Sequence, residues 1–299
     1  MNRREHLRQL SSLAILPLLG LTTADTKLMR RTIPGKSETL PVVGLGTWQT
    51  FDAGPDSYAP IREVLSTLVE QGGSVIDSSP MYGKSEEVVG TLSTELNLNA
   101  KLFIATKVWI RGQKQGIGQM NESFAKLKRG KIDLMQIHNL VDWANHMKTL
   151  TEWKAQGRVR YIGLTHYTVS SHETVEEIMR NNKVDFIQIN YNLLDRNAEK
   201  RLLPAARDLG VGVLVNRPFE EGALFSRVNG KSLPEWAGEF DCASWGQFFL
   251  KYILSHPAVT CVIPGTSKVK HLADNLGAGM GKLPDESQRA KMVEWVKSL

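Results

Sequence analysis

Cysteine is scarce in this sequence, which holds only Cys242 and Cys261 among its 299 residues. Two cysteines do not make the disulfide framework of a small secreted domain, and neither stands in a Cys-x-x-Cys or Cys–His metal spacing. In the order of strands and helices set out below, they lie at opposite ends of one helix, about 20 Å apart for a helix of about 14 residues. A disulfide needs Cα atoms within about 7 Å. We therefore expect two free thiols in packing positions and no metal site.

Blocks of positive charge are also lacking. Lysine and arginine total 37 against 31 acidic residues, a formal net charge of +6, and no run of them resembles a nucleic-acid-binding stripe. Apolar residues make up 41% and charged residues 23%, which is ordinary for a globular protein with a sizeable core. The length suits one α/β barrel. We expect a single such domain and no nucleic-acid partner.

Residues 1–24 have the order of a secretory signal. The basic pair Arg3-Arg4 precedes an apolar run over residues 13–21, and Thr-Thr-Ala follows. The run is too short to span a bilayer comfortably, so no stable membrane insertion is expected once the signal is removed. The basic pair resembles a twin-arginine export signal. We expect a periplasmic protein with its domain over residues 25–299; the alternative is a cytoplasmic protein with a floppy N-terminal tail.

Short apolar segments alternate with longer amphipathic ones about eight times along the chain. The short segments suit strands buried on both faces of a parallel sheet. Strands are expected at Val43–Thr47, Ser74–Asp77, Leu102–Lys107, Leu134–His138, Tyr161–Leu164, Phe186–Asn190, Gly212–Asn216 and Cys261–Pro264. Helices are expected at Pro60–Glu70, Glu86–Glu95, Gly118–Arg129, Met147–Gln156, Ser170–Asn181, Glu199–Leu209, Ala243–Ser255 and Val269–Leu276. The alternation predicts the α/β class and a (β/α)8 TIM barrel of parallel strands, with an N-terminal β-hairpin over residues 27–41 and a C-terminal helix over residues 285–297.

An open, doubly wound sheet is the alternative architecture. A dinucleotide-binding sheet of that kind carries the pattern G-x-G-x-x-G after its first strand. The corresponding segment here, GLGTWQ over residues 44–49, lacks the third glycine and opens no obvious helix. The closed barrel is therefore the preferred interpretation.

Four side chains are expected to meet at one mouth of the barrel, because catalytic residues of a barrel come from the C-terminal ends of its strands. They are Asp77, Tyr82 in the loop after it, Lys107 and His138. Each alone would be a commonplace cap, packing or surface residue. A phenol has a pKa of about 10, and a nearby ammonium lowers it. Lys107 held by Asp77 would make Tyr82 a proton donor, and His138 would orient a carbonyl oxygen. This set suits carbonyl reduction by hydride transfer.

The segments around these residues resemble the aldo-keto reductase family. IDSSPMYGKSE (76–86) is similar to the family signature. The further blocks, in order between residues 40 and 277, are ATKV (105–108), MQIHN (135–139), GLTHY (163–167), IQINYN (187–192) and IPGT (263–266). The resemblance implies that Asp77, Tyr82, Lys107 and His138 form the family's catalytic tetrad. It also implies NADP(H) as the cofactor and a small-molecule carbonyl compound as the substrate.

The resemblance extends to the nicotinamide side of the site. The family holds the carboxamide with a Ser-Asn pair after the fifth strand and a Gln in the sixth. Thr165-His166 stand in place of the pair, and the Gln is present as Gln188. Asn216 replaces the family's stacking Tyr after the seventh strand. The neighbouring candidates for cofactor contact are Arg217, Pro218 and Phe219.

The segment after the eighth strand is similar to the family's adenosine-binding block. It begins the last barrel helix, whose free N–H groups favour phosphate. Lys268, Lys270 and His271 can face a 2′-phosphate, with His271 where the family often has Arg. No acidic residue stands at the start of the block to select a free ribose hydroxyl, so NADP(H) is favoured over NAD(H). The candidate contacts are Gly265, Thr266, Ser267, Lys268, His271 and Asn275.

Aromatic residues are expected beside the site. Trp48 follows the first strand, Trp109 the third, and Trp143 lies in the loop after His138. Such walls suit an apolar or aromatic carbonyl compound; simple packing is the alternative. Family members with strict substrate demands often carry a longer aromatic C-terminal loop, so an open pocket with broad specificity is expected here.

Two other functions stay open at this stage. A redox-sensing or partner-regulating subunit that binds NADPH with little turnover would carry the same four residues. Metal-assisted hydrolysis on the same barrel would need histidines and carboxylates at ligand spacing, companions that His138 lacks. The oligomeric state does not follow from these residues.

Overall fold

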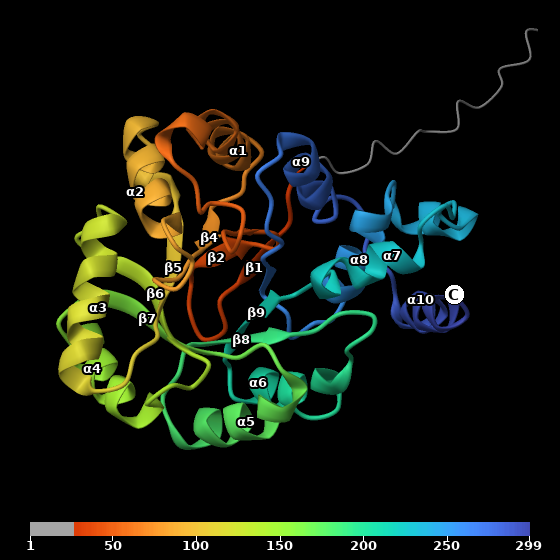
Figure 1. Cartoon of the computed structure of the whole chain (residues 1–299). Helices are drawn as coiled ribbons and strands as arrows, with labels where there is room; N and C mark the ends of the chain where they lie inside the picture. The colour runs from red at the N-terminus through yellow and green to blue at the C-terminus, as the bar shows by residue number, and fades with distance from the viewer. Residues whose placement is uncertain (1–26) are drawn as a thin grey trace, which may run out of the picture.

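A ring of parallel strands enclosed by helices forms the body of the protein (Figure 1). The structure is a computed structural model that describes residues 27–299, so the predicted signal segment lies outside the described residues. The ring strands pair in sequence order, and isolated bridges between Val43 and Val262 and between Gly46 and Gly265 join the last strand to the first. The predicted (β/α)8 barrel is confirmed. The ring strands are β3 (Leu45–Gly46), β4 (Val75–Asp77), β5 (Phe103–Val108), β6 (Ile132–His138), β7 (Val159–Thr165), β8 (Phe186–Asn190), β9 (Gly212–Asn216) and β10 (Cys261–Val262).

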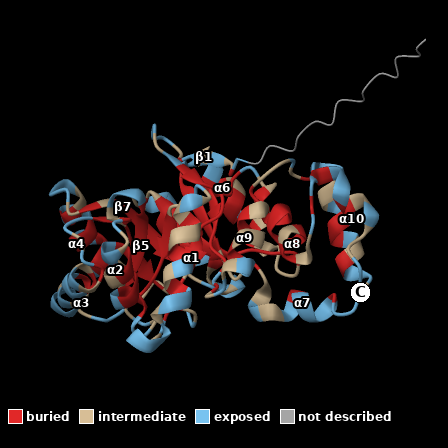
Figure 2. Cartoon of the chain, turned by 90° about the horizontal axis from the view of Figure 1, so that it is seen from above, coloured by how far each residue is buried: buried red, intermediate tan, exposed pale blue. Residues whose placement is uncertain are grey.

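Helices connect successive strands and cover the outside of the ring. Their inward faces are buried and their outward faces exposed, which Figure 2 shows around the buried strands. None of the helices in residues 27–299 is long and apolar enough to cross a membrane. The helices are α1 (Tyr58–Glu70), α2 (Ser85–Glu95), α3 (Gln113–Lys126), α4 (Trp143–Ala155), α5 (His172–Asn181), α6 (Leu202–Asp208), α7 (Ala223–Arg227), α8 (Trp245–Leu254), α9 (Val269–Gly277) and α10 (Glu286–Lys297).

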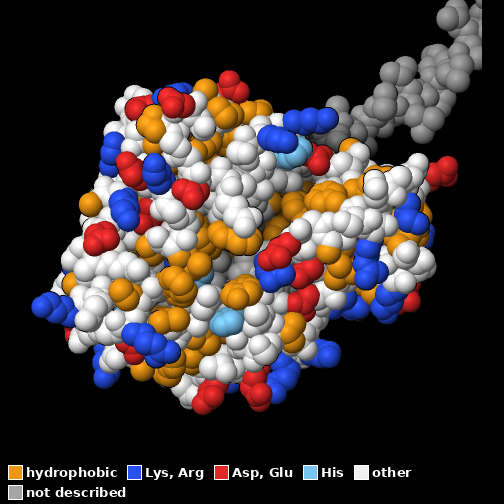
Figure 3. Space-filling view, in the orientation of Figure 1, with side chains coloured by type: hydrophobic (Ala, Val, Ile, Leu, Met, Phe, Trp, Pro, Cys, Tyr) orange, Lys and Arg blue, Asp and Glu red, His pale blue; other side chains and the backbone are white. Residues whose placement is uncertain are grey.

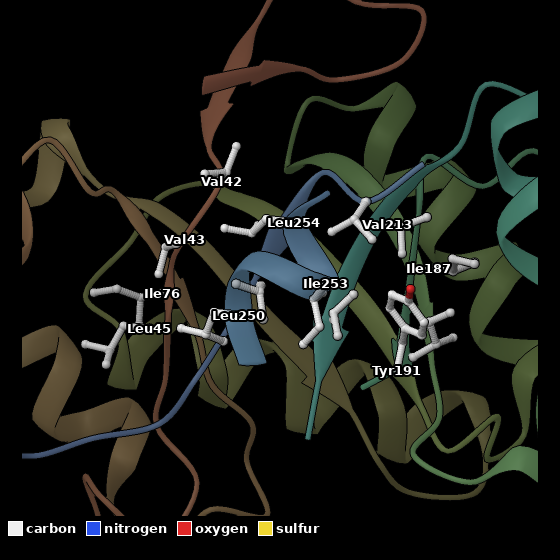
Figure 4. Packing of buried hydrophobic residues seen from close by; sticks show 14 of the residues in the cluster. Val42, Val43, Leu45, Ile76, Ile187, Tyr191, Val213, Leu250, Ile253 and Leu254 are labelled. Atoms are coloured by element: carbon white, nitrogen blue, oxygen red, sulfur yellow. The ribbon is translucent and has the colours of Figure 1, made fainter. Parts of the chain in front are cut away.

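The seam of the barrel is where the structure departs most from the predicted strands. β3 and β10 have two residues each, against four or five expected. A Cβ atom on Gly46 would lie 2.8 Å from the carbonyl oxygen of Ile263, so the two strands approach closely only because residue 46 is glycine. Helix α8 covers this seam: Leu250, Ile253 and Leu254 are buried with Val43 in one apolar cluster (Figure 4).

An N-terminal hairpin closes the far end of the barrel. Its strands, β1 (Arg30–Thr32) and β2 (Thr39–Pro41), pair antiparallel, as predicted. Ile33 and Leu40 are buried in the same cluster as Leu134 and Phe186 from inside the ring. The interior is therefore a packed core at this end, and any site must lie at the other.

Several helix boundaries differ from the prediction. α3 and α4 begin at Gln113 and Trp143, earlier than expected, while α6 is short and is preceded by a 3₁₀ turn over residues 197–199. Between β9 and α8 the chain forms α7 and a 3₁₀ helix over Glu235–Phe240, which the sequence did not predict. The final helix is confirmed, with a capping box at Asp285. Cys242 and Cys261 are both buried and free, as expected.

Candidate active site

The four predicted side chains come together at the C-terminal mouth of the barrel. The Nζ atom of Lys107 lies 2.5 Å from Oδ2 of Asp77 and 4.8 Å from the centre of the Tyr82 ring. The rings of Tyr82 and His138 meet edge to face with centroids 5.9 Å apart. Asp77, Lys107 and His138 are buried on strands β4, β5 and β6, and Tyr82 lies on the loop that follows β4. The neighbouring strands therefore bring Asp77, Lys107 and His138 together, and the loop after β4 adds Tyr82.

Lys107 carries its charge inside the barrel. Burial lowers the pKa of its ammonium, but the charge of Asp77, with Tyr82 adding to it, outweighs burial and leaves the pKa above its ordinary value. The ammonium also donates to the Ser78 carbonyl at 2.7 Å. Lys107 is thus a fixed cation beside the Tyr82 phenol.

Tyr82 is under two opposing influences. Burial raises the pKa of its phenol, and the charge of Lys107 lowers it, with Asp77 adding a smaller rise. Lys107 lowers the pKa of Tyr82, as expected from the sequence, but burial raises it by more, so the pKa lies above the usual tyrosine value. A phenol in this state holds its proton at neutral pH and has a cation ready for the phenolate that forms when the proton leaves.

His138 is neutral in this setting. Burial, Lys107 and His166 together lower its pKa to about 2. Its Nδ1 atom lies 3.1 Å from the Ser79 hydroxyl, which also accepts a bond from the Met81 amide at 3.3 Å. The Ser79 hydroxyl has two lone pairs and one proton, so it can accept from Met81 and donate to Nδ1; in that tautomer of His138 the ring proton is on Nε2. His138 therefore presents a neutral N–H donor.

Two polar residues of the site were missed by sequence reasoning. Gln136, two residues before His138 on β6, donates to Oδ1 of Asp77 at 2.9 Å. Ser79 holds His138. The sequence could have indicated Gln136, because side chains two residues apart on a strand point to the same side and His138 was already placed in the site. Ser79 stands inside the signature segment and gave no signal of its own.

The residues predicted to hold the nicotinamide form a polar patch on β7, β8 and β9. Thr165 donates to the Gln188 side-chain oxygen at 3.1 Å, and Asn216 approaches that oxygen at 3.5 Å. The Gln188 amide nitrogen is occupied by Asp77 at 2.7 Å. Asn216 also donates to the His166 carbonyl at 3.2 Å. Both polar atoms of the Gln188 side chain therefore have partners within the protein. Asn216 connects Gln188 to the loop after β7 because its amide reaches both the Gln188 oxygen and the His166 carbonyl.

The loop after β9 leaves two buried polar atoms without a bonded partner among residues 27–299: Oδ1 of Asn216 and Nε of Arg217. Arg217 pairs with Glu220 at 2.7 Å and lies 5.7 Å from the Tyr167 ring centre. Pro218 between them is buried. An unsatisfied acceptor and an unsatisfied donor on consecutive residues at the C-terminal end of β9 suit a ligand that carries an amide.

The predicted adenosine-binding residues cluster at the start of α9. Lys268 caps this helix, and Lys270 and His271 occupy its first turn; all three are exposed, and none forms an ion pair with a residue in 27–299. Thr266 accepts from the Lys268 amide at 3.1 Å. Gly265 is exposed, Ser267 half-buried and Asn275 buried. The helix start thus offers free N–H groups together with positive charge, a combination that suits phosphate.

An apolar rim surrounds the mouth. Trp48 and Trp109 are 45% and 41% exposed, and the Trp109 ring lies 6.2 Å from that of His138. Figure 3 shows hydrophobic side chains gathered around a central hollow on this face. The prediction that Trp143 lies in the loop beside the site was wrong. Helix α4 starts earlier than predicted, so Trp143 is its first residue and packs against the apolar core.

Comparison with known proteins shows the family and the fold. The model of the "Aldo/keto reductase family" matches residues 42–292. The chain is 29% identical over 217 residues to "Aldo-keto reductase YhdN" of Bacillus subtilis (strain 168), a match that covers 67% of this chain and 63% of that protein. It is 30% identical to the "NADH-specific methylglyoxal reductase" of Escherichia coli (strain K12) over 66% of this chain and 69% of that protein.

A solved structure shares the fold. The aldo/keto reductase from Klebsiella pneumoniae in complex with NADP and acetate superposes with a TM-score of 0.74 at 20% identity, covering 91% of this chain and 95% of the other. At that identity the likeness shows the architecture alone.

Proposed function

Because the chain belongs to the aldo/keto reductase family of oxidoreductases, we propose that it reduces the carbonyl group of a small molecule to an alcohol with NADPH, and that Tyr82 donates the proton. The observation that carries the proposal is the position of the Lys107 ammonium, 2.5 Å from Asp77 and 4.8 Å from the Tyr82 ring centre. A buried cation next to a phenol is the arrangement that a proton donor of this kind needs.

The residues of the mouth fit a nicotinamide dinucleotide. The unpaired acceptor of Asn216 and donor of Arg217 can bond an amide group. The exposed cations at the start of α9 can hold phosphate. When bound, the cofactor supplies the hydride that adds to the carbonyl carbon.

The side chains of the mouth supply the rest of the chemistry. The N–H of His138 donates a hydrogen bond to the carbonyl oxygen and orients it. The Tyr82 hydroxyl gives its proton to the oxygen as negative charge develops there. Lys107 stabilises the phenolate left behind, and Asp77 keeps the ammonium in place. These groups lie on strand ends or next to them, so little reorganisation accompanies the reaction.

The choice of NADPH rests on Lys268, Lys270 and His271. The similar proteins do not agree on the cofactor: one relative is named an NADH-specific reductase, and one solved structure contains NADP. Measuring kcat/KM with NADPH and with NADH for the purified protein decides between them. The proposal expects NADPH to be preferred. It expects Lys268→Glu to erase that preference, and Lys297→Glu, the same charge change at an exposed side chain of α10, to leave it intact. Preference for NADH in the unaltered protein contradicts the assignment.

The substrate is expected to be an apolar or aromatic aldehyde or ketone, admitted with broad specificity. The exposed indoles of Trp48 and Trp109 flank the mouth and offer apolar contact area. A panel of aliphatic and aromatic aldehydes tests this. We expect values of kcat/KM within about 200-fold across the panel, since one methylene more or less in a hydrophobic contact changes kcat/KM by about 10- to 200-fold. One aldehyde preferred by several orders of magnitude would contradict broad specificity.

Export is the proposed fate of the chain, on the basis of Arg3-Arg4 and the apolar run that follows. The test is fractionation of a Gram-negative host that expresses the full chain, beside a variant with Arg3→Lys and Arg4→Lys. We expect a periplasmic product shortened near residue 24 for the first and a cytoplasmic product for the second. A cytoplasmic product that retains Met1 in the unaltered chain would support the cytoplasmic alternative.

A further inference from the structure

We propose that Gln136 is a positioning residue for this reaction, acting through Asp77 on the Lys107–Tyr82 pair. The proposal rests on the function proposed above. Gln136 lies on β6, fully buried, and its Cα is the register partner of Lys107 on β5. Among the described residues its side-chain amide bonds Asp77 and Gln188 and makes no hydrogen bond to Lys107, Tyr82 or His138. Of its two partners, Asp77 is the one that holds the Lys107 ammonium.

The two oxygens of Asp77 have separate partners. Oδ2 accepts from the Lys107 ammonium at 2.5 Å. Oδ1 accepts from two amides, Gln136 at 2.9 Å and Gln188 at 2.7 Å. A carboxylate with donors on both oxygens cannot rotate without breaking several hydrogen bonds at once. Gln136 thus helps fix the direction in which Asp77 holds Lys107.

The polarity of this network follows from the charge of Asp77. An ionised carboxylate only accepts hydrogen bonds, so the amide nitrogens of Gln136 and Gln188 must face it. The oxygen of Gln136 then accepts from Gln188 at 3.2 Å. In consequence the oxygen of Gln188 faces the other way, toward Thr165 at 3.1 Å. Gln136 therefore joins the proton-donor side of the site to the side proposed for the nicotinamide.

The backbone makes room for this side chain. Gly163 is the register partner of Gln136 on β7, and a Cβ atom there would lie 2.8 Å from Cγ of Gln136. A larger residue at position 163 would push the glutamine away from Asp77. The glutamine at position 136 therefore depends on glycine at position 163, whereas a smaller apolar residue at position 136 would not need that glycine.

Loss of the Gln136 amide leaves Oδ1 with one donor in a buried setting, so Asp77 can turn and the ammonium moves with it relative to Tyr82. The titratable groups that face Asp77 are Lys107 on β5, Tyr82 after β4 and the buried thiol of Cys261 on β10. His138 lies on the same strand as Gln136 and remains neutral. A change at Gln136 is therefore expected to show in the titration of Tyr82.

The first test replaces the amide by an apolar side chain. Gln136→Leu is compared with Leu134→Val, which alters the same strand one interior layer below without touching Asp77. We expect Gln136→Leu to lower kcat by about 10- to 100-fold, the scale of a misplaced reacting group, with KM for the carbonyl and the Kd for NADPH changed less than about threefold. We expect Leu134→Val to lower Tm and leave kcat unchanged. Equal kcat in the two variants overturns the proposal.

The second test covers the case in which the leucine variant fails to fold. In Gln136→Glu the new carboxyl, while protonated, donates to Oδ1 of Asp77 as the amide does. When it ionises, two carboxylates face each other and the bond is lost. We expect a new descending limb in the pH profile of kcat, at lower pH than the limb of the unaltered enzyme. The added negative charge is also expected to raise the pKa of Tyr82. The readout is the absorbance of tyrosinate as the pH rises, and the part due to Tyr82 is the part that disappears when Tyr82→Phe is added to the variant.

The outcomes separate the two proposals. If the unaltered protein turns over no carbonyl, the proposed function fails, while the tyrosinate titration still tests the link from Gln136 to Tyr82. If the protein is active but Gln136→Glu has an unaltered pH profile and an unaltered Tyr82 titration, the positioning role of Gln136 is wrong and the proposed function stands.

Discussion

Lys107 and Asp77 form an ion pair inside the barrel, with Nζ 2.5 Å from Oδ2 and side-chain exposures of 0% and 3%. A pair so deeply buried gains little net stability over apolar residues of similar size, because both charges lose their hydration. The proposed function gives the pair a reason to stand in the barrel interior, because the charge of Lys107 favours the phenolate of Tyr82. The same reasoning predicts how the pair responds when one partner is removed.

Replacing Lys107 by methionine is expected to destabilise the protein by about 3–5 kcal/mol, because the Asp77 carboxylate is left buried without its counter-charge. The same change should lower kcat by about 10²- to 10⁴-fold, the usual contribution of a positioned acid or base. Denaturant unfolding gives the first quantity and steady-state kinetics with saturating NADPH give the second.

The matched control adds Asp77→Asn to Lys107→Met. We expect the double variant to regain much of the lost stability, since no unpaired charge remains, and to stay as inactive as the single variant. Recovery of activity together with stability would mean that the pair serves the fold and not the proton donor.

Ser79→Ala is expected to lower kcat by about five- to tenfold, the effect of one neutral hydrogen bond of about 1 kcal/mol. The hydroxyl holds Nδ1 of His138 at 3.1 Å, and its loss frees the ring to place the proton on either nitrogen. Nitrogen NMR of the imidazole should show the mixed tautomers. Ser93→Ala, another buried serine but on α2, is the control and should retain full activity. An unchanged tautomer in Ser79→Ala contradicts the assignment.

The pH dependence of reduction should contain no histidine limb. The pKa of His138 lies at about 2, against an ordinary 6.5, so the ring stays neutral from roughly pH 5 to 8. The reaction needs the protonated phenol, and burial raises the pKa of Tyr82. The rate should therefore fall only above the ordinary tyrosine value of about 10. A limb near neutral pH that vanishes in His138→Asn would contradict this account.

Glu86→Gln is expected to stabilise the protein at neutral and alkaline pH. Oε2 of this buried carboxyl has no bonded partner among residues 27–299, and burial raises its pKa. A carboxyl whose folded-state pKa is raised favours the folded state below its unfolded pKa and loses that contribution as pH rises through the folded value. The amide avoids the ionisation and can donate to the Ser123 hydroxyl, which lies close enough to the carboxyl to lower its pKa against the effect of burial.

The gain from Glu86→Gln should be about 1–3 kcal/mol, the usual penalty for a buried unpaired group, with kcat unchanged. Unfolding measured at several pH values checks it. The difference from the unaltered protein should shrink as the pH falls; a difference that is constant with pH would show that ionisation of Glu86 is not its cause.

The barrel and its four central side chains were predictable from the sequence for one reason. Parallel strands present their C-terminal ends to one mouth, so placing Asp77, Lys107 and His138 at strand ends places them together. The first residues of the helices were harder to predict from the sequence. Trp143 was read as a loop residue because the left-handed residues just before it, Asn139, Leu140 and Asp142, carry no sequence signal of where the helix begins.

Other features depend on contacts that a sequence does not display. α7 and the 3₁₀ helix before α8 are too short to show a helical period, and aromatic packing such as Phe219 against Phe225 holds this segment. Gln188 was assigned to the cofactor from its block, whereas its bonds to Asp77 and Gln136 appear only in three dimensions. Gln136 stands two residues before the end of its strand, and only its bond to Asp77 in three dimensions marks it as part of the site.

The most direct test of the account is the oxidation of NADPH by the purified protein with a nitrobenzaldehyde, beside Tyr82→Phe, with NADPH affinity measured for both. We predict turnover by the unaltered protein, and loss of most of kcat in Tyr82→Phe, about 10²-fold or more, at unchanged NADPH affinity. If both proteins bind NADPH and turn over at the same rate, Tyr82 is not the proton donor. If both bind and neither reduces any aldehyde, a redox-sensing or partner-regulating role replaces the enzyme.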